Sequence, residues 1–144
     1  MADSKKVLIV DDDADFATVL ENRLKQGGYQ VVVAQSGEEA LATVKTILPD
    51  LILLDLGLPD LPGDIAALRI KSENGNRVIP IIALTGHGDP LTRSTTRAMG
   101  FVDHIVKPYE SEDLFKRIEK ALENSNTFLT KRQDEKPEED TNYR

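Results

Sequence analysis

The sequence contains no cysteine and no tryptophan in its 144 residues, and only two histidines. Without cysteine, the chain can form no disulfide, no thiolate metal site and no cysteine nucleophile. The shortage of histidine makes zinc a poor candidate for any metal site as well. Long apolar runs are also lacking, so no segment predicts a membrane span or the central region of a signal peptide. We therefore expect a cytoplasmic protein with no membrane partner.

The composition indicates a single globular domain. Hydrophobic residues make up 40% of the chain and charged residues 30%, which is an ordinary balance for a soluble protein. A chain of this length can bury one sizeable core. The formal net charge of -7 argues against direct binding to a nucleic-acid backbone and favours a site that holds a cation.

The segment Leu51–Asp60, LILLDLGLPD, leads four consecutive apolar residues into a single carboxylate, Asp55. Such a run predicts a strand that is buried on both faces, and the glycine and prolines after it indicate a loop. Ligands of an open parallel sheet bind at the carboxyl ends of its strands, so Asp55 is predicted at a ligand-binding edge. Taken alone, the pattern would also fit an ordinary acid at the start of a surface loop.

Short apolar strands alternate with segments of helical periodicity along the chain. Strands are predicted at Lys5–Val10, Tyr29–Ala34, Leu51–Leu54, Val78–Leu84 and Phe101–Val106. Helices are predicted after Asp13, after Ser36, over Asp64–Lys71, from Asp89 or Pro90 to Met99, and after a capping Ser111. Because parallel neighbours need helical crossovers, this alternation predicts an α/β doubly wound fold, with a five-stranded parallel sheet and helices on both faces. Residues 1–123 would form this domain, and residues 124–144 are charged enough to predict a disordered tail.

Local signals mark the ends of the first two helices. Asp13 and Asp15 are interpreted as N-terminal acids favoured by the helix dipole, not as metal ligands. Gly27–Gly28 ends the first helix, and Ser36 with Glu39 forms a capping box for the second. The buried faces of these helices are predicted to be Phe16, Val19, Leu20 and Leu24, and then Ala40, Leu41, Val44, Ile47 and Leu48.

The predicted strands bring chemically active side chains to one edge of the sheet. Asp11 and Asp12 follow the first strand, Asp55 the third, Thr85 the fourth and Lys107 the fifth. Two like charges about 4 Å apart repel by roughly 4 kcal/mol at an effective dielectric near 20, so three carboxylates require a cation. Mg²⁺ fits because it prefers oxygen ligands. A carboxylate beside it can attack phosphorus and form an aspartyl phosphate, while the lysine offsets charge and the threonine donates to a phosphoryl oxygen.

Four motifs at these strand ends, VLIVDDD, LLDLGLPD, ALTGHG and HIVKP, resemble in type and order the receiver domain of two-component response regulators. The resemblance covers about Lys5 to Glu123 and implies the strand order 2-1-3-4-5 of flavodoxin-like folds. It also implies a cis Lys107–Pro108 peptide bond. It further implies these roles: Asp55 as phosphoacceptor, Asp12 and Asp55 as direct Mg²⁺ ligands, Asp11 acting through water or charge, the Gly57 carbonyl as a further ligand, Lys107 as partner of the phosphoryl group and Thr85 as the switch hydroxyl.

Two features leave the mechanism of signalling open. His104 stands where the family more often has phenylalanine or tyrosine, the aromatic residue that turns inward when the switch hydroxyl moves. A histidine could still turn inward, or it could stay outward and leave signalling to the loops. Gly57, Gly86 and His87 lie at positions that, by the family resemblance, flank the access of water to the phosphoryl group, and we hypothesise that the phosphoryl lifetime depends partly on His87.

The first function that fits is a stand-alone phosphoacceptor switch. It would accept a phosphoryl group from a sensor histidine kinase or a phosphotransfer protein, and would change its affinity for a downstream protein target. It would not be an enzyme, although it would assist its own phosphorylation and dephosphorylation. Arg93 and Arg97 lie on a polar helix that is either a solvated face or the fourth-helix side of the surface that receivers use to dimerise or bind partners. We expect a monomer or a phosphorylation-dependent dimer. No DNA-binding domain is predicted after Asn124, unless the chain is a fragment of a larger response regulator or hybrid kinase.

Two other classes of protein compete with this interpretation. A haloacid-dehalogenase-type phosphatase carries an Asp-x-Asp motif after its first strand, which Asp11 and Asp13 satisfy, but this function would leave Asp55 unexplained. A flavodoxin-type module would need a hydroxyl-rich phosphate loop after the first strand, and this sequence has acids there instead.

Overall fold

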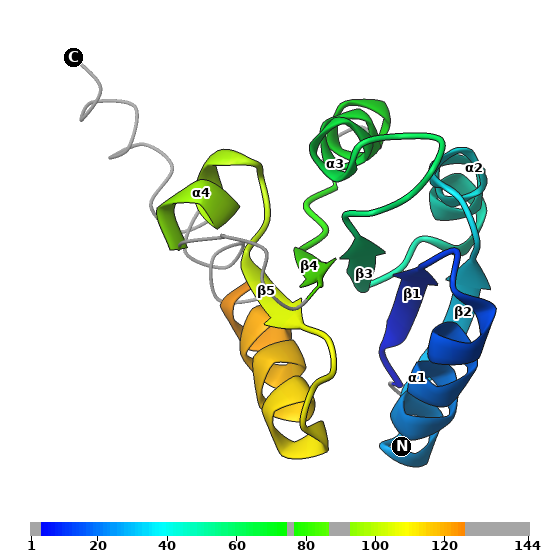
Figure 1. Cartoon of the computed structure of the whole chain (residues 1–144), viewed down its shortest axis with the longest axis vertical. Helices are drawn as coiled ribbons and strands as arrows, with labels where there is room; N and C mark the ends of the chain where they lie inside the picture. The colour runs from blue at the N-terminus through cyan, green and yellow to red at the C-terminus, as the bar shows by residue number, and fades with distance from the viewer. Residues whose placement is uncertain (1–3, 75–76, 87–92, 126–144) are drawn as a thin grey trace.

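A computed structural model describes residues 4–74, 77–86 and 93–125. Its strands are β1 (Lys6–Val10), β2 (Gln30–Ala34), β3 (Leu51–Asp55), β4 (Ile81–Thr85) and β5 (Asp103–Val106). They form one parallel sheet in the order β2-β1-β3-β4-β5 (Figure 1). The predicted fold class and strand order are therefore confirmed.

Helices cover both faces of this sheet (Figure 1). They are α1 (Ala14–Gln26), α2 (Gly37–Ile47), α3 (Gly63–Glu73) and α4 (Arg93–Ala98), followed by a helix that runs from residue 111 through residue 125. In the described ranges, no helix is long and apolar enough to cross a membrane. The predicted start of the fourth helix and the predicted disordered tail fall largely outside the described residues.

Two apolar layers, one on each face of the sheet, hold the helices in place. Alternate residues of each central strand point to opposite faces, so both faces of β1, β3 and β4 are buried, as expected for a parallel sheet covered on both sides. One layer packs α2 and α3 on the sheet through Ala40, Leu41, Val44, Ala66, Ala67 and Ile70. The other packs α1 and the C-terminal helix through Ala17, Leu20, Leu24, Leu114, Ile118 and Ala121.

The predicted helix ends are largely confirmed. Asp13 caps α1 by accepting a hydrogen bond from a backbone N–H at 3.1 Å, and Gly28, with a φ of 97°, lies just past its end. Ser36 caps α2 and accepts from the Glu39 N–H at 3.1 Å. The Glu39 carboxylate reaches back to the N–H of Gln35 rather than to that of the cap. The capping box therefore closes one residue earlier than its usual form.

Two residues predicted on buried helix faces are exposed. Val19 is 53% exposed because Ala17, Leu20 and Leu24 form the buried stripe of α1 and Val19 lies to one side of it. Leu48 is 49% exposed. It is the C-cap of α2 and adopts a left-handed conformation with φ 50°, so it lies outside the helix whose face was predicted to include it.

Several boundaries also differ from the prediction, most of them by one or two residues. β4 begins at Ile81 rather than Val78, because Pro80 has no N–H to donate to the sheet. β5 begins at Asp103 rather than Phe101. The last helix begins at Ser111 itself, and the carbonyl of Glu110 accepts the first helical hydrogen bond. Glu110 is therefore at the capping position that was assigned to Ser111.

Candidate functional site

Three carboxylates meet at the carboxyl ends of β1 and β3. One oxygen from each of Asp11, Asp12 and Asp55 lies within 4.8 Å of the others. We refer to these three residues as the acid cluster. The register of β1 with β3 pairs Val10 with Leu54, so the residues that follow in each strand lie side by side. The sequence-based placement of this cluster is thus confirmed.

Asp11 is the enclosed member of the cluster. Its side chain is completely buried, and its Oδ2 accepts from the ammonium group of Lys107 at 2.9 Å. Its Oδ1 accepts from the backbone N–H of Asp13 at 2.9 Å. Because both oxygens are engaged and the side chain is buried, Asp11 is the least accessible of the three carboxylates.

Asp55 is the partly accessible member, with 13% of its side chain exposed. Burial raises the pKa of its carboxyl group, and the negative charge of Asp11 adds to this effect. A hydrogen bond from the backbone N–H of Gly57 at 3.0 Å and the nearby charge of Lys107 work in the opposite direction. The net direction is a raised pKa, so the surroundings disfavour the charged form of Asp55.

Lys107 lies between Asp11 and Asp55 and forms an ion pair with each carboxylate. Its Nζ lies 2.9 Å from Asp11 and 3.6 Å from Asp55. Burial alone would lower the pKa of Lys107, but its hydrogen bond and attraction to Asp11 outweigh that effect and raise the pKa. The Phe16 ring lies beneath the ammonium group at 4.3 Å from ring centroid to Nζ, and Tyr109 packs edge-on against that ring. The sequence analysis missed this aromatic support because nothing in the sequence links the two positions.

Thr85 ends β4 beside the acid cluster and is 1% exposed. Its hydroxyl donates to the carbonyl of Ile105 over 3.5 Å, which is a long hydrogen bond. The backbone N–H of Lys107 donates to the Thr85 carbonyl at 2.8 Å, so the lysine and the threonine are fixed to each other. The Lys107–Pro108 bond is cis, as the family resemblance implied. Gly86 is exposed, and His87 lies outside the described residues.

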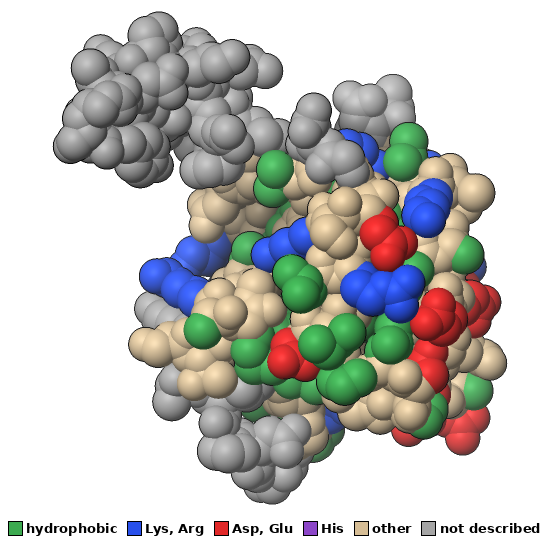
Figure 2. All heavy atoms as spheres, turned by 90° about the horizontal axis from the view of Figure 1, so that it is seen from above, with side chains coloured by type: hydrophobic (Ala, Val, Ile, Leu, Met, Phe, Trp, Pro, Cys, Tyr) green, Lys and Arg blue, Asp and Glu red, His purple; other side chains and the backbone are tan. Residues whose placement is uncertain are grey.

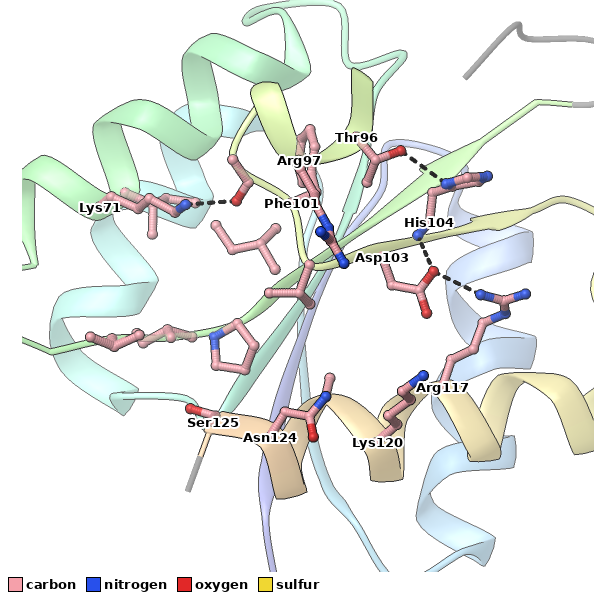
Figure 3. A pocket seen from close by; sticks show the side chains of 18 of the residues that line it. Lys71, Thr96, Arg97, Phe101, Asp103, His104, Arg117, Lys120, Asn124 and Ser125 are labelled. Carbon is pink, nitrogen blue, oxygen red and sulfur yellow. Dashed lines mark hydrogen bonds and ion pairs between the residues drawn. The ribbon is translucent and has the colours of Figure 1, made fainter. Parts of the chain in front are cut away.

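His104 contacts the fourth helix. Its Nδ1 lies 3.0 Å from the hydroxyl of Thr96 on α4, and Thr96 is itself buried (Figure 3). The neighbouring Asp103 accepts from the His104 backbone N–H at 2.8 Å and from Arg117 at 2.7 Å. In this structure His104 therefore ties β5 to α4. The side chain of Arg93 is not among the described ones.

The loop that follows Asp55 is fixed at two points that the sequence analysis did not identify. Asp60 accepts hydrogen bonds from the backbone N–H groups of Gly37 at 2.9 Å and Glu38 at 3.0 Å. These bonds lower the pKa of Asp60. At the other end of the loop, Gly63 packs so closely on Leu56 that a Cβ there would lie 3.0 Å from the Leu56 Cα and collide with its Cδ2. Both contacts position the backbone next to Asp55.

The donor set of the acid cluster suits a hard divalent cation. All of its ligand atoms are carboxylate oxygens, which Mg²⁺ prefers. Asp12 is exposed, and Asp55 is only partly buried, so both can offer an oxygen to an ion that keeps several waters. Asp11 is engaged by Lys107.

A family model of the response regulator receiver domain matches residues 7–119. The chain belongs to the response regulator receiver family. As a receiver domain, it takes part in two-component signalling. Solved structures of receiver domains have the same fold. A CheY-like receiver domain protein from Methanospirillum hungatei JF-1 is 26% identical, with a TM-score of 0.77 over 87% of this chain and 98% of that one. The chemotaxis response regulator CheY4 of Vibrio cholerae is 28% identical, with a TM-score of 0.75 over 83% of this chain and 99% of that one.

Curated relatives of this receiver domain are transcriptional regulators. The "Probable transcriptional regulator ycf27" of Guillardia theta is 40% identical over 122 residues, which are 85% of this chain and 47% of that protein. The alkaline phosphatase synthesis transcriptional regulatory protein PhoP of Bacillus subtilis (strain 168) is 33% identical over 122 residues, which are 85% of this chain and 50% of PhoP. The chain thus spans about half the length of the curated relatives it matches.

Proposed function

We propose that this receiver domain is a Mg²⁺-dependent phosphoacceptor switch in which Asp55 accepts a phosphoryl group from a phosphohistidine. The donor is a sensor histidine kinase or a phosphotransfer protein. One observation carries the assignment of the nucleophile: Lys107 lies between two acids, of which Asp11 is sealed and Asp55 is partly exposed. A phosphatase of the haloacid-dehalogenase type would need Asp11 as its nucleophile, which this geometry disfavours.

In the proposed step, a carboxylate oxygen of Asp55 attacks the phosphorus atom of the donor. An O–P bond forms while the N–P bond of the phosphohistidine breaks, and the imidazole leaves with the electron pair of that bond and is protonated. Lys107, whose raised pKa keeps it charged, offsets the negative charge on the phosphoryl oxygens. Asp12 and Asp55 would hold Mg²⁺ with the Gly57 carbonyl, while Asp11 contributes through water or charge, and the bound ion would offset negative charge in the same way.

The signal would leave the site through Thr85. Its hydroxyl makes only a long bond of 3.5 Å to the Ile105 carbonyl, so it can exchange that bond for a shorter one to a phosphoryl oxygen at little cost. The backbone next to Ile105 carries His104, which is bonded to α4. A shift of Thr85 would therefore reach α4 through β5 and change the surface offered to a partner.

The output is a change in affinity for a downstream protein target, with no direct contact to nucleic acid by this domain. Because the curated relatives are transcriptional regulators about twice as long as the aligned region, the same switch could equally control a DNA-binding output region of a larger regulator. The domain would also assist its own dephosphorylation, with Gly57, Gly86 and His87 setting the access of water. The rate of phosphoryl loss in His87→Ala, compared with wild type, tests that last point: an unchanged rate would remove His87 from the proposal.

The readout can be tested without a kinase. Beryllofluoride imitates a phosphoryl group on a carboxylate, so with Mg²⁺ it should shift the NMR resonances of Thr85, His104 and residues 93–98 of the wild-type chain. Asp55→Ala should show none of these shifts. Equal responses from both proteins would contradict the assignment of Asp55.

A further inference from the structure

A pocket of about 830 Å³ lies away from the acid cluster, where β4 and β5 begin. It is bordered by the end of α3, by α4, by β5 and by the C-terminal helix (Figure 3). No residue of the acid cluster lines it. A volume of this size falls in the range of ligand-binding pockets in proteins, about 300–1,000 Å³. We refer to it as the basic pocket, for the reason that follows.

Among the described residues, five cationic side chains line the pocket, and one acidic side chain does. The cations are Lys71, Arg77, Arg97, Arg117 and Lys120, and the acid is Asp103. This is a local excess of positive charge on a chain whose formal net charge is -7. In Figure 2 most acidic side chains lie toward the α2 side, whereas lysine and arginine side chains are spread across the face.

Most of these cations have no acidic counterpart in the described part of the chain. Arg117 is paired with Asp103 and with a second aspartate on its own helix. Among the described residues, no carboxylate lies within 4.0 Å of the charged nitrogens of the other four cations. Lys71 and Arg77 donate to backbone carbonyls instead. Their positive charges are therefore held in position, and no described carboxylate pairs with them.

The pocket also offers apolar surface. Val78 and Val102 line it and are 46% and 53% exposed. Behind them, Ile79 and Phe101 are buried and form an apolar floor. An occupant that matches the pocket therefore combines acidic side chains with one or two apolar ones.

The chain itself continues from the rim of this pocket with such a sequence. Asn124 and Ser125 are lining residues. Phe128 and Leu129 follow within four positions, Lys131 and Arg132 come next, and the segment Asp134–Asp140, DEKPEED, then brings five acids and a single lysine. Asp134 lies nine positions after Ser125, and an extended chain of that length spans up to about 30 Å. The acidic run can therefore reach any side chain of the pocket.

We infer that residues 126–140 of this chain dock in the basic pocket. Phe128 and Leu129 would cover Val78 and Val102, and the acidic run would lie along the four cations. Ion pairs at such exposed positions are individually weak, but a tethered segment acts at an effective concentration in the millimolar range, so weak contacts suffice. Because Arg97 lies on α4, docking would also occupy a surface of the helix that His104 contacts.

The lack of native cysteine provides a direct test in the full chain. A spin label is attached to the single cysteine of Thr141→Cys, next to the acidic run, and amide NMR signals are recorded without any phosphoryl donor. Docking predicts that the amide signals of Lys71, Val102 and Lys120 are broadened several-fold more than those of α1. The broadening should fade at 1 M salt, where the screening length falls to about 3 Å from about 10 Å at 0.1 M.

Charge reversal supplies the matched control. Arg97→Glu combined with Lys120→Glu should abolish the selective broadening. Arg23→Glu combined with Lys25→Glu makes the same change in net charge on exposed α1 side chains outside the pocket, and it should leave the broadening intact. Adding Glu138→Lys and Glu139→Lys to the pocket variant should restore part of the effect, because the charges are then exchanged across the contact.

Two results would overturn the inference. One is broadening that is uniform over the domain or insensitive to both salt and the pocket variant. The other comes from a mixture in which one chain carries the isotope label and a second, separate chain carries the spin label. If the amide signals of the isotope-labelled chain are broadened there, the occupant of the pocket is a second copy. Since no phosphorylation is involved, either result leaves the proposed role of Asp55 untouched.

Discussion

Asp55 keeps its negative charge in surroundings that oppose it. Its side chain is largely buried and lies beside Asp11, whose own charge is permanently engaged by Lys107. Lys107 lies closer to Asp11 than to Asp55. A metal ion bound at this site would relieve the remaining repulsion between the carboxylates.

The raised pKa of Asp55 predicts how replacing this residue changes the free energy of unfolding. At a pH between the ordinary pKa of 3.8 and the raised pKa of the folded state, the folded chain binds a proton that the unfolded chain has lost. The free energy of unfolding therefore falls as the pH rises through this range, and it remains lower at higher pH. Without Mg²⁺, Asp55→Asn should therefore be more stable than wild type at pH 7, by about 0.5–2 kcal/mol. The gain should shrink as the pH falls below the raised value. Urea unfolding of both proteins across this pH range measures it, and a variant that is less stable at pH 7 would contradict the pKa assignment.

The residues of the candidate site could be predicted because backbone topology alone brings them together. Parallel strands end at one edge, so Asp11, Asp55, Thr85 and Lys107 meet whatever their neighbours do. The supporting contacts could not be predicted. The position of Phe16 under Lys107 depends on how α1 packs, and periodicity gives no information about such a contact.

At the scale of helices and strands, the segments before and after β3 each contain a constrained backbone position. The end of α2 places Leu48 at φ 50°, a left-handed conformation that is costly for a residue with a Cβ. The loop after Asp55 closes on Gly63, where a side chain would strike Leu56. Strand positions followed from apolar runs, whereas these features depend on backbone geometry that a hydrophobic pattern does not encode.

Leu48→Gly should stabilise the chain. Glycine adopts the left-handed conformation without a steric penalty and the leucine is half exposed, so we expect a gain of about 0.5–1 kcal/mol. Leu68→Gly is the matched control, because Leu68 is also exposed but lies inside α3. There glycine should cost about 1 kcal/mol. Chemical denaturation of both variants gives the comparison, and a loss of stability in Leu48→Gly would show that its contacts outweigh its strain.

Gly63→Ala should destabilise the chain by about 1–3 kcal/mol, because the added methyl group meets the Leu56 backbone. Gly57→Ala, in the same loop, provides the comparison. Its nearest neighbour would be the Asp55 carboxylate at 3.6 Å, an ordinary contact, so its effect should stay within about 0.5 kcal/mol. Similar unfolding midpoints for the two variants would refute the close packing of this loop.

At the scale of the whole molecule, the sheet separates two regions of opposite charge. The acid cluster lies at the carboxyl ends of the strands, and the basic pocket lies where β4 and β5 begin. Only the first could be predicted from the sequence, since it depends on strand ends alone. The second combines side chains from α3, α4, β5 and the last helix, and their arrangement depends on how these elements pack.

Binding of Mg²⁺ to the acid cluster should stabilise the whole fold. A ligand present at 100 times its dissociation constant adds about 2.7 kcal/mol if it binds only the folded state. The thermal unfolding midpoint should therefore rise from EDTA to saturating Mg²⁺ in wild type, and much less in Asp12→Asn. Asp13→Asn is the control, because asparagine preserves the α1 cap and Asp13 is not in the cluster. An equal Mg²⁺ response in Asp12→Asn and wild type would exclude Asp12 as a ligand.

The most direct test of the phosphoacceptor assignment is to locate the phosphoryl group. The full chain is incubated with Mg²⁺ and phosphoramidate, a donor that carries an N–P bond like that of phosphohistidine. Borohydride then reduces any aspartyl phosphate to homoserine, and peptide mass spectrometry identifies the position. We predict homoserine at position 55 in wild type and at no position in Asp55→Asn. Homoserine at Asp11 or Asp12, or undiminished modification of Asp55→Asn, would contradict the account.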